Sequence, residues 1–169
     1  MEAMGNGEAG RAAGKPTLAG KYLTFVLGDE EYGVPVLKAR EIIKMMDVTP
    51  VPQTPRHVRG VINLRGRVIP VVDLRLKFGL PPREAADRTC IIVVDAELPS
   101  GCVRMGVVVD GVSEVLTLSG GEIEEAPTLG DGASHEELLG LAKVKGTVKI
   151  LLDLDRVLGR DGLVLPRPV

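Results

Sequence analysis

The chain has 169 residues, of which 44% are hydrophobic and 26% are charged; these proportions are typical of a folded globular protein and exclude disorder throughout. Its longest apolar run, at 90–94, is far shorter than the about 18–20 residues of a membrane-spanning helix, so no insertion into a membrane is expected. The net charge of −2 combines a basic half, with 12 basic and 8 acidic residues at 21–88, and an acidic half, with 5 basic and 12 acidic residues at 89–159, an asymmetry that usually concerns the steering of partners.

Ten short apolar segments separated by turn signals predict strands. Val and Ile are abundant whereas only 2% of the residues are aromatic, and β-branched residues favour extended backbone. Strands of this length and spacing indicate barrels or a sandwich. In chain order the segments are 22–27, 32–36, 40–46, 61–64, 68–72, 90–94, 103–109, 113–118, 141–144 and 148–152.

Glycine and aspartate mark turns and brief helices between these strands. Gly66 and Gly146 lie in short gaps between two strands, where glycine can adopt the positive φ of a tight turn. Asp73 and Asp153 each follow an apolar strand and can cap one or two helical turns. Thr54 before Pro55 predicts a further short helix.

An internal repeat divides the folded part of the chain. Residues 60–79 align with 140–159, and residues 33–42 align with 106–115. The repeat predicts two five-stranded units, roughly 21–88 and 89–159. Each unit is small for independent stability, so we expect the two units to share a core or to pack firmly together. The flanking segments 1–20 and 160–169 lack periodicity and are expected to be flexible tails.

The sequence offers few residues for catalysis or metal binding. His57, His135, Cys90 and Cys102 are its only histidines and cysteines, which is too few for a metal-binding set. Both cysteines are interpreted as reduced, buried side chains, as expected in the cytoplasm. No nucleophile motif or phosphate-binding glycine loop is present, and the aspartates after the strands are better explained as helix caps than as acid–base residues. We therefore expect a protein without enzymatic activity, metal or cofactor.

A basic stretch leaves a nucleic-acid interface open as an alternative. Six cations lie between Arg56 and Lys77, opposed only by Asp73. Barrels that bind single strands also need aromatic stacking platforms, and this stretch has none before Phe78. A protein-binding face is therefore favoured, and RNA or DNA binding is the alternative.

Three motifs resemble those of one protein family. They are LGDEEYGV at 27–34, NLRGxxxPxxDLR at 63–75 and VVDGVSEVL at 108–116. In this order, within about 21–158, they are similar to the motifs of the CheW family, the adaptors of bacterial chemosensory arrays. The resemblance implies one domain at 21–159, an all-β fold of two intertwined five-stranded SH3-like barrels side by side, roughly 21–88 and 89–159, with a few short helices. It also implies no catalysis and no cofactor.

The resemblance also implies two partners, the regulatory domain of the histidine kinase CheA and the cytoplasmic tip of chemoreceptors. The chain is accordingly expected in the cytoplasm, at receptor arrays. The groove between the barrels would receive the receptor, and barrel ends would receive the kinase. Residues expected to bind partners, by motif position, are Val36, Ala39, Glu41, Gly60, Asn63, Arg65 and Gly66.

Glu41 and Arg65 have two interpretations. They match the acid and the arginine that the family associates with partner coupling, but they could equally form a surface ion pair that only supports the fold. The repeat places Glu114 and Lys145 at the equivalent positions, and for this second pair a structural ion pair is the favoured interpretation.

Overall fold

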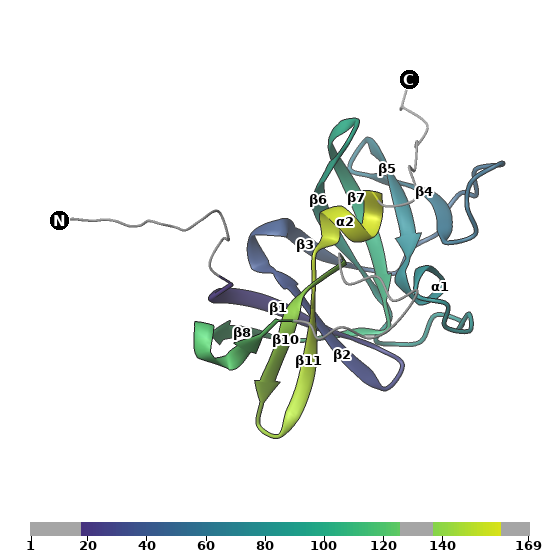
Figure 1. Cartoon of the computed structure of the whole chain (residues 1–169). Coiled ribbons are helices and arrows are strands. Elements are labelled where there is room, and N and C mark those ends of the chain that lie inside the picture. The colour runs from purple at the N-terminus through teal and green to yellow at the C-terminus, as the bar shows by residue number, and fades with distance from the viewer. Residues whose placement is uncertain (1–17, 126–136, 160–169) are drawn as a thin grey trace.

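A computed structural model of the chain describes residues 18–125 and 137–159, where most of the regular structure is extended strand. The strands form two sheets that pack against each other (Figure 1). Sheet 1 has the order β8-β1-β2-β11-β10-β9, and sheet 2 has the order β3-β6-β7-β5-β4. The all-β fold with a few short helices that the sequence predicts is confirmed.

All ten predicted strands are present, and the two-residue β9 is an addition. Sheet 1 contains β1 (Gly20–Leu27), β2 (Glu30–Pro35), β8 (Gly111–Leu118), β9 (Ile123–Glu124), β10 (Leu138–Val144) and β11 (Thr147–Leu152). Sheet 2 contains β3 (Ala39–Lys44), β4 (Val58–Leu64), β5 (Arg67–Asp73), β6 (Cys90–Leu98) and β7 (Gly101–Val109). The short helical elements are η2 (Val36–Lys38), α1 (Leu74–Lys77), η3 (Gly120–Glu122) and α2 (Leu154–Gly159).

The two halves of the sequence exchange strands between the sheets. β5 pairs in parallel with β7, and β11 pairs in parallel with β2. Sheet 2 is therefore built from 39–109, whereas sheet 1 joins 20–35 to strands between 111 and 152. Neither sheet corresponds to one of the halves 21–88 and 89–159, and the chain crosses between the sheets at η2 and again at Asp110.

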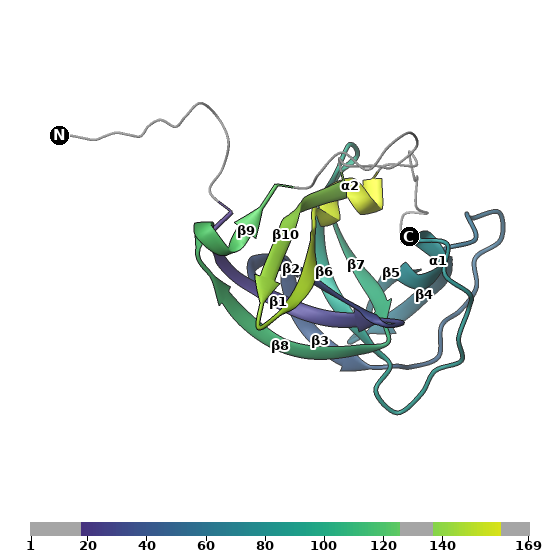
Figure 2. The same ribbon diagram turned by 60° about the horizontal axis from the view of Figure 1, so that its bottom comes forward.

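Each sheet curls until its first and last members meet, and Figure 2 shows this curvature. Beyond β3, Thr49 forms a bridge with Val61 of β4, and its N–H donates to the Val61 carbonyl at 2.8 Å. In sheet 1, β9 follows β8 in the chain and pairs with β10 at the opposite end of the strand order. Two repeat-equivalent glycines permit these approaches. A Cβ at Gly60 would lie 2.0 Å from the Thr49 carbonyl oxygen, and a Cβ at Gly140 would lie 2.7 Å from the Glu124 carbonyl oxygen.

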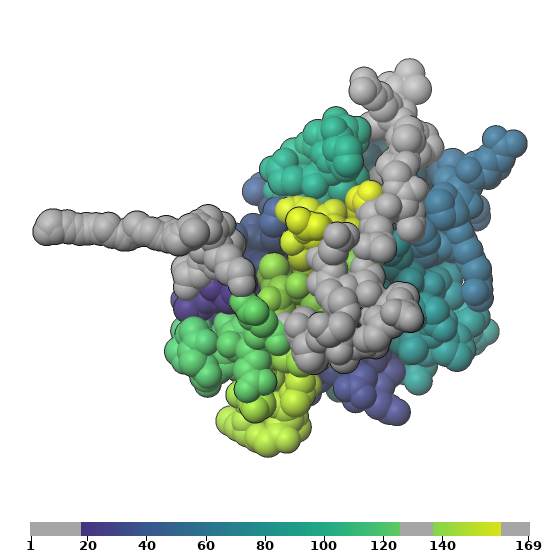
Figure 3. Space-filling model, viewed as in Figure 1, coloured from purple at the N-terminus to yellow at the C-terminus, as the bar shows by residue number. Residues whose placement is uncertain are grey.

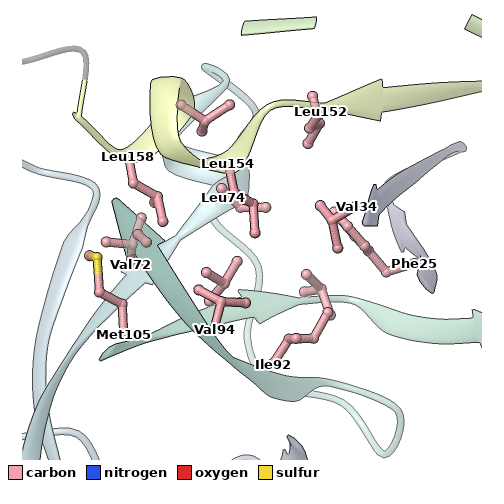
Figure 4. Packing of buried hydrophobic residues seen from close by; sticks show 14 of the residues in the cluster. Phe25, Val34, Val72, Leu74, Ile92, Val94, Met105, Leu152, Leu154 and Leu158 are labelled. Carbon is pink, nitrogen blue, oxygen red and sulfur yellow. The ribbon is translucent and has the colours of Figure 1, made fainter. Parts of the chain in front are cut away.

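The largest apolar cluster lies between the two sheets. Phe25 and Val34 enter it from sheet 1, Ile92 and Val94 enter it from β6, and α2 covers it (Figure 4). The alternate residues of β6 point instead to the inner side of the curled sheet 2, where Ile91 and Val93 are fully buried. β6 is thus buried on both faces, which explains why its sequence is an uninterrupted apolar run rather than an alternating one. A third cluster, Tyr22, Leu118, Ala142 and Leu151, fills the interior of sheet 1.

The predicted aspartate caps are confirmed. The Asp73 carboxylate accepts the Arg75 and Leu76 N–H groups at the start of α1, and the Asp153 carboxylate accepts the Arg156 N–H at 3.3 Å. The helix predicted after Thr54 is wrong. That segment forms turns, because the Val58 N–H donates back to the Pro55 carbonyl and β4 begins at once.

The prediction that both cysteines are buried is wrong for Cys102. Cys90 is partly buried at the start of β6, whereas Cys102 is exposed near the start of β7. Cys102 lies opposite Glu97 and alternates with Val103, which packs against the cluster between the sheets, so its side chain is on the exposed face of the β6–β7 hairpin. The tails predicted at 1–20 and 160–169 lie outside the described residues except at 18–20, where Gly20 already begins β1. Among residues 18–125 and 137–159, no helix has the length and apolar character needed to span a membrane.

The two cysteines should react with a thiol reagent at very different rates in the native protein. Cys102 is accessible, whereas burial shields Cys90 and raises the pKa of its thiol, which lowers the reactive thiolate fraction. Labelling with Ellman's reagent should therefore show one fast equivalent that disappears in Cys102→Ser and persists in Cys90→Ser. Fast labelling that survives in Cys102→Ser would show that the start of β6 is not packed as described.

Substitution of Gly60 should destabilise the fold. A Cβ at this position collides with the Thr49 backbone, and the positive φ of 142° adds strain, so Gly60→Ala should lower the free energy of unfolding by about 3 kcal/mol. Gly120→Ala is the matched control, since nothing lies within 4 Å of its Cβ position. Urea unfolding followed by far-ultraviolet circular dichroism measures the free energy of unfolding of both variants. Equal stability of the two variants would contradict the close contact between Thr49 and β4.

Candidate functional site

A tight turn between β4 and β5 presents Arg65 at one end of sheet 2. Arg65 and Gly66 both have positive φ, 50° and 87°, the combination of a type I′ hairpin turn. The Asn63 side-chain oxygen accepts the Gly66 N–H at 2.9 Å and so fixes the turn. Lys145 and Gly146 repeat this geometry with φ of 51° and 82°. The predicted position of Arg65 at a hairpin turn is confirmed.

Arg65 forms an ion pair with Glu41 of β3. β3 and β4 lie at opposite ends of the strand order in sheet 2, so the pair joins the two ends where the sheet curls on itself. The hydrogen bond from Arg65, followed by the charges of Arg65, Arg104 and Arg40, lowers the pKa of Glu41, and Glu41 in turn raises the pKa of Arg65. The arginine side chain is still 67% exposed, so a partner can reach most of its donors.

An apolar side chain lies exposed in the hairpin that carries Arg65. Val68, which is 44% exposed, lies opposite Asn63 in this β4–β5 hairpin, whereas the exposed Ile42, next to Glu41 on β3, points from the other face of that strand. A charged fork of donors next to an exposed aliphatic side chain is found at protein-binding surfaces. We call Glu41, Asn63, Arg65, Gly66 and Val68 the turn surface.

A second surface lies at the first crossing between the sheets. The start of β1, the end of β2 and η2 surround a groove of about 480 Å³ whose lining residues are mostly apolar. Val36 and Leu37 of η2 both line it, and Leu37 is 92% exposed. Ala39 follows as the first residue of β3. The full lining is Leu18, Ala19, Gly20, Lys21, Tyr22, Pro35, Val36, Leu37 and Leu139.

The seven residues predicted to bind partners thus fall into three places. Four of them, Glu41, Asn63, Arg65 and Gly66, lie together at the turn surface, and Val36 and Ala39 lie at the first crossing. Gly60 is separate, because it is buried in the seam between β4 and Thr49.

The expected ion pair between Glu114 and Lys145 is not formed. In the described part of the chain, Lys143 and Glu124 pair instead at that edge of sheet 1, at 2.8 Å. Sequence reasoning also missed Leu37 as a groove residue. The available signal was an apolar residue in the gap between two predicted strands, where no core position requires one.

Two carboxylates connect the sheets at the two crossings. At the second crossing, Asp110 accepts hydrogen bonds of 2.7 Å from Arg75 Nη1, beside sheet 2, and from the Gly28 N–H, in the β1–β2 turn of sheet 1. At the first crossing, Lys38 of η2 pairs with Asp155 of α2 at 2.8 Å. The Arg75–Asp110 pair is almost fully buried, so removal of Asp110 would leave the Arg75 guanidinium buried without a carboxylate partner, which is costly.

The basic stretch between Arg56 and Lys77 is largely committed to contacts within the protein. Arg59 pairs with Asp73, Arg65 pairs with Glu41, and Arg75 pairs with Asp110. The nearby aromatic ring, Phe78, stacks on Tyr32 inside the molecule. The described residues bring no group of three or more His, Cys, Asp or Glu together that could hold a metal ion.

The Glu41–Arg65 pair should be visible in a pH titration. Because the pKa of Glu41 is lowered in the folded state, the pair stabilises the fold above the ordinary pKa of a glutamate, and this contribution disappears as the pH falls through the pKa of folded Glu41. Carboxyl-detected NMR should find a pKa below the usual value that rises in Arg65→Ala and is unchanged in Lys143→Ala. An ordinary Glu41 pKa in the unmodified chain would show that the pair does not persist in solution.

The comparisons with known proteins agree with this geometry. The family model described as "CheW-like domain" matches residues 21–162. The chemotaxis protein CheW of Klebsiella aerogenes is 37% identical over 88% of this chain and 87% of its own length. The CheW protein of Rhizobium meliloti is 36% identical over 83% and 94%, and protein FrzA of Myxococcus xanthus is 32% identical over 75% and 76%.

A solved structure shows the same fold. The crystal structure of the scaffolding protein TtCheW from Thermoanaerobacter tengcongensis superposes with a TM-score of 0.72 at 31% identity, covering 83% of this chain and 92% of that one. The residues that the family model matches, 21–162, include both crossings, strands of both sheets and the three motifs of the resemblance. The chain belongs to the CheW-like family of chemotaxis adaptor and scaffolding proteins.

Proposed function

We propose that the chain is a non-enzymatic adaptor that couples chemoreceptors to the histidine kinase CheA in bacterial chemosensory signalling. Membership of the CheW-like family supports this role. The observation that carries it is the presence of two separate candidate surfaces, the turn surface and the groove at the first crossing, on one continuous core. An adaptor of this kind acts by mass action, since two partners bound to one rigid body meet at a raised effective concentration.

The groove is the proposed site for the cytoplasmic tip of the receptor. Its lining is predominantly aliphatic, and Leu37 offers a large apolar side chain that the fold itself does not bury. An amphipathic helix docks through such a surface by placing side chains at helical spacing into a groove. The protein would accordingly work in the cytoplasm, beside receptors that are themselves in the membrane.

The turn surface is the proposed site for the regulatory domain of CheA. Its arginine lies in the hairpin that also exposes Val68, and the guanidinium presents a fixed fork of donors that lysine cannot reproduce. Glu41 orients this fork by holding one of its nitrogens. The nucleic-acid alternative has less support, because three of the six cations in the basic stretch are paired with carboxylates.

Substitutions at the ion pair should separate the two interpretations of Glu41 and Arg65. We expect Arg65→Ala and Arg65→Lys each to weaken binding of a CheA regulatory-domain fragment by about tenfold, the loss of a central interfacial arginine, and to change the melting temperature little. Glu41→Ala should weaken binding less, and the double variant should be no weaker than Arg65→Ala alone, because Glu41 acts through the arginine. Isothermal titration calorimetry measures all four affinities.

Lys143→Ala is the matched control, since Lys143 is 66% exposed and paired with Glu124, as Arg65 is 67% exposed and paired with Glu41. This variant should bind the kinase fragment normally. Unchanged affinity in Arg65→Ala and Glu41→Ala would assign the pair to the fold alone and remove the turn surface from the functional residues.

A further inference from the structure

The short element η2 forms one wall of the groove, but very little of its apolar surface is buried against the rest of the protein. None of its three residues is buried, and the Leu37 side chain, which lines the groove, is 92% exposed. Its backbone closes one hydrogen bond, from the Ala39 N–H to the Val36 carbonyl. A segment with so little buried surface opens easily unless a polar contact restrains it.

Asp155 supplies that polar contact. Lys38 Nζ donates to both oxygens of the Asp155 carboxylate, at 2.8 and 3.1 Å, and Asp155 Oδ1 also accepts the Glu97 N–H at 2.8 Å. One carboxylate therefore ties η2 to α2 and to β6. Partial burial lowers the pKa of Lys38, but the hydrogen bond and charge of Asp155, with the charges of Glu97 and Asp153, raise it overall, so the ammonium stays charged at neutral pH.

The anchor on the other side of this contact is rigid. Asp155 lies in α2, whose Leu154, Val157 and Leu158 are buried in the cluster between the sheets. In the space-filling view α2 and the early part of the chain meet on one face of the molecule (Figure 3). Lys38 and Asp155 are 117 residues apart in sequence, so the restraint on η2 comes from an element distant in sequence, the helix α2.

We infer that Asp155 is a positioning residue for the groove: through Lys38 it holds η2, and thereby Leu37, in the conformation that the partner binds. This inference rests on the proposed function of the groove as the receptor site. Asp155 does not line the groove, so it acts on binding only through η2.

At the second crossing an ion pair also joins the crossing to a helix, but the charges of the two partners are reversed. There the carboxylate is Asp110, on the crossing itself, and the cation is Arg75, at the start of the helix. Arg75 and Asp155 occupy equivalent positions of the internal repeat. An ion pair between a crossing and the helix of the opposite half thus occurs twice, which is the arrangement expected if each pair fixes its crossing.

The test measures the restraint and the binding separately. Native-state hydrogen exchange reports the opening of η2 through the Ala39 amide, and calorimetry reports the affinity for a receptor-tip fragment and for a CheA regulatory-domain fragment. In Asp155→Asn and in Lys38→Gln, Ala39 protection should fall about tenfold and receptor affinity should fall by a similar factor, while kinase affinity stays unchanged. Lys38→Arg keeps the charge and should retain both protection and affinity.

Glu124→Gln is the control, because it breaks an ion pair of the same length, with Lys143, away from η2. Unchanged Ala39 protection in Asp155→Asn and Lys38→Gln overturns the inference, and so does a loss of protection that leaves receptor affinity intact. Leu37→Asp tests the groove itself, since its exposed side chain can change without cost to the core. If Leu37→Asp binds the receptor fragment normally, the proposed site fails, whatever the exchange data show for Asp155.

Discussion

The parallel pairing of β5 with β7 and of β11 with β2 is the constraint on which the rest of the structure depends. Each pairing places a strand from one half of the repeat beside a strand from the other half, so neither half can complete a sheet alone. Gly106 lies opposite Val71 at one of these junctions, where a Cβ would come within 2.8 Å of Ile91. The exchange therefore makes two small β units into one body whose largest apolar cluster is shared.

Both candidate surfaces follow from this exchange. The chain must cross between the sheets twice, and the first crossing leaves η2 on the surface with Leu37 beside the groove. Sheet 2 contains β3 and β4 at the two ends of its strand order, and its curvature brings Glu41 within reach of Arg65. The ion pairs of Asp110 and Asp155 then hold the crossings. Partner binding and the fold are thus coupled through a few polar contacts at places where the chain changes sheets.

The strands could be predicted from the sequence because the pattern of apolar residues along a strand shows directly which of its side chains are buried. The uninterrupted run of β6 predicted a strand, and the repeat predicted that Arg65–Gly66 and Lys145–Gly146 are equivalent turns, which their matching φ values confirm. The motif at 63–75 also contains Asn63, Arg65 and Gly66, which lie together with Glu41 at the turn surface.

The resemblance implied intertwined barrels, but which strands pair across the two halves could not be predicted. The alternation of apolar and polar residues shows which face of a strand is buried but not which strand lies beside it. For the same reason Asp110–Gly111 resembles a hairpin turn in sequence although β7 and β8 belong to different sheets. Cys102 and Leu37 show a second limit. Cys102 lies before the predicted strand at 103–109 and Leu37 lies between two predicted strands, so neither residue belonged to a predicted alternation, and the three-dimensional arrangement decides their exposure.

The division of the chain between the sheets also sets an order for folding during synthesis. Sheet 2 is contiguous, so all of its strands have left the ribosome once residue 109 has emerged, whereas sheet 1 waits for β11, near the end of the chain. Until then the side of β6 and β7 that packs against sheet 1 is covered only by the strands of sheet 1 already made, and Leu152, Leu154, Val157 and Leu158 are not yet in place. An apolar surface exposed for this interval is open to contacts with other chains, so β11 and α2 complete its protection against aggregation.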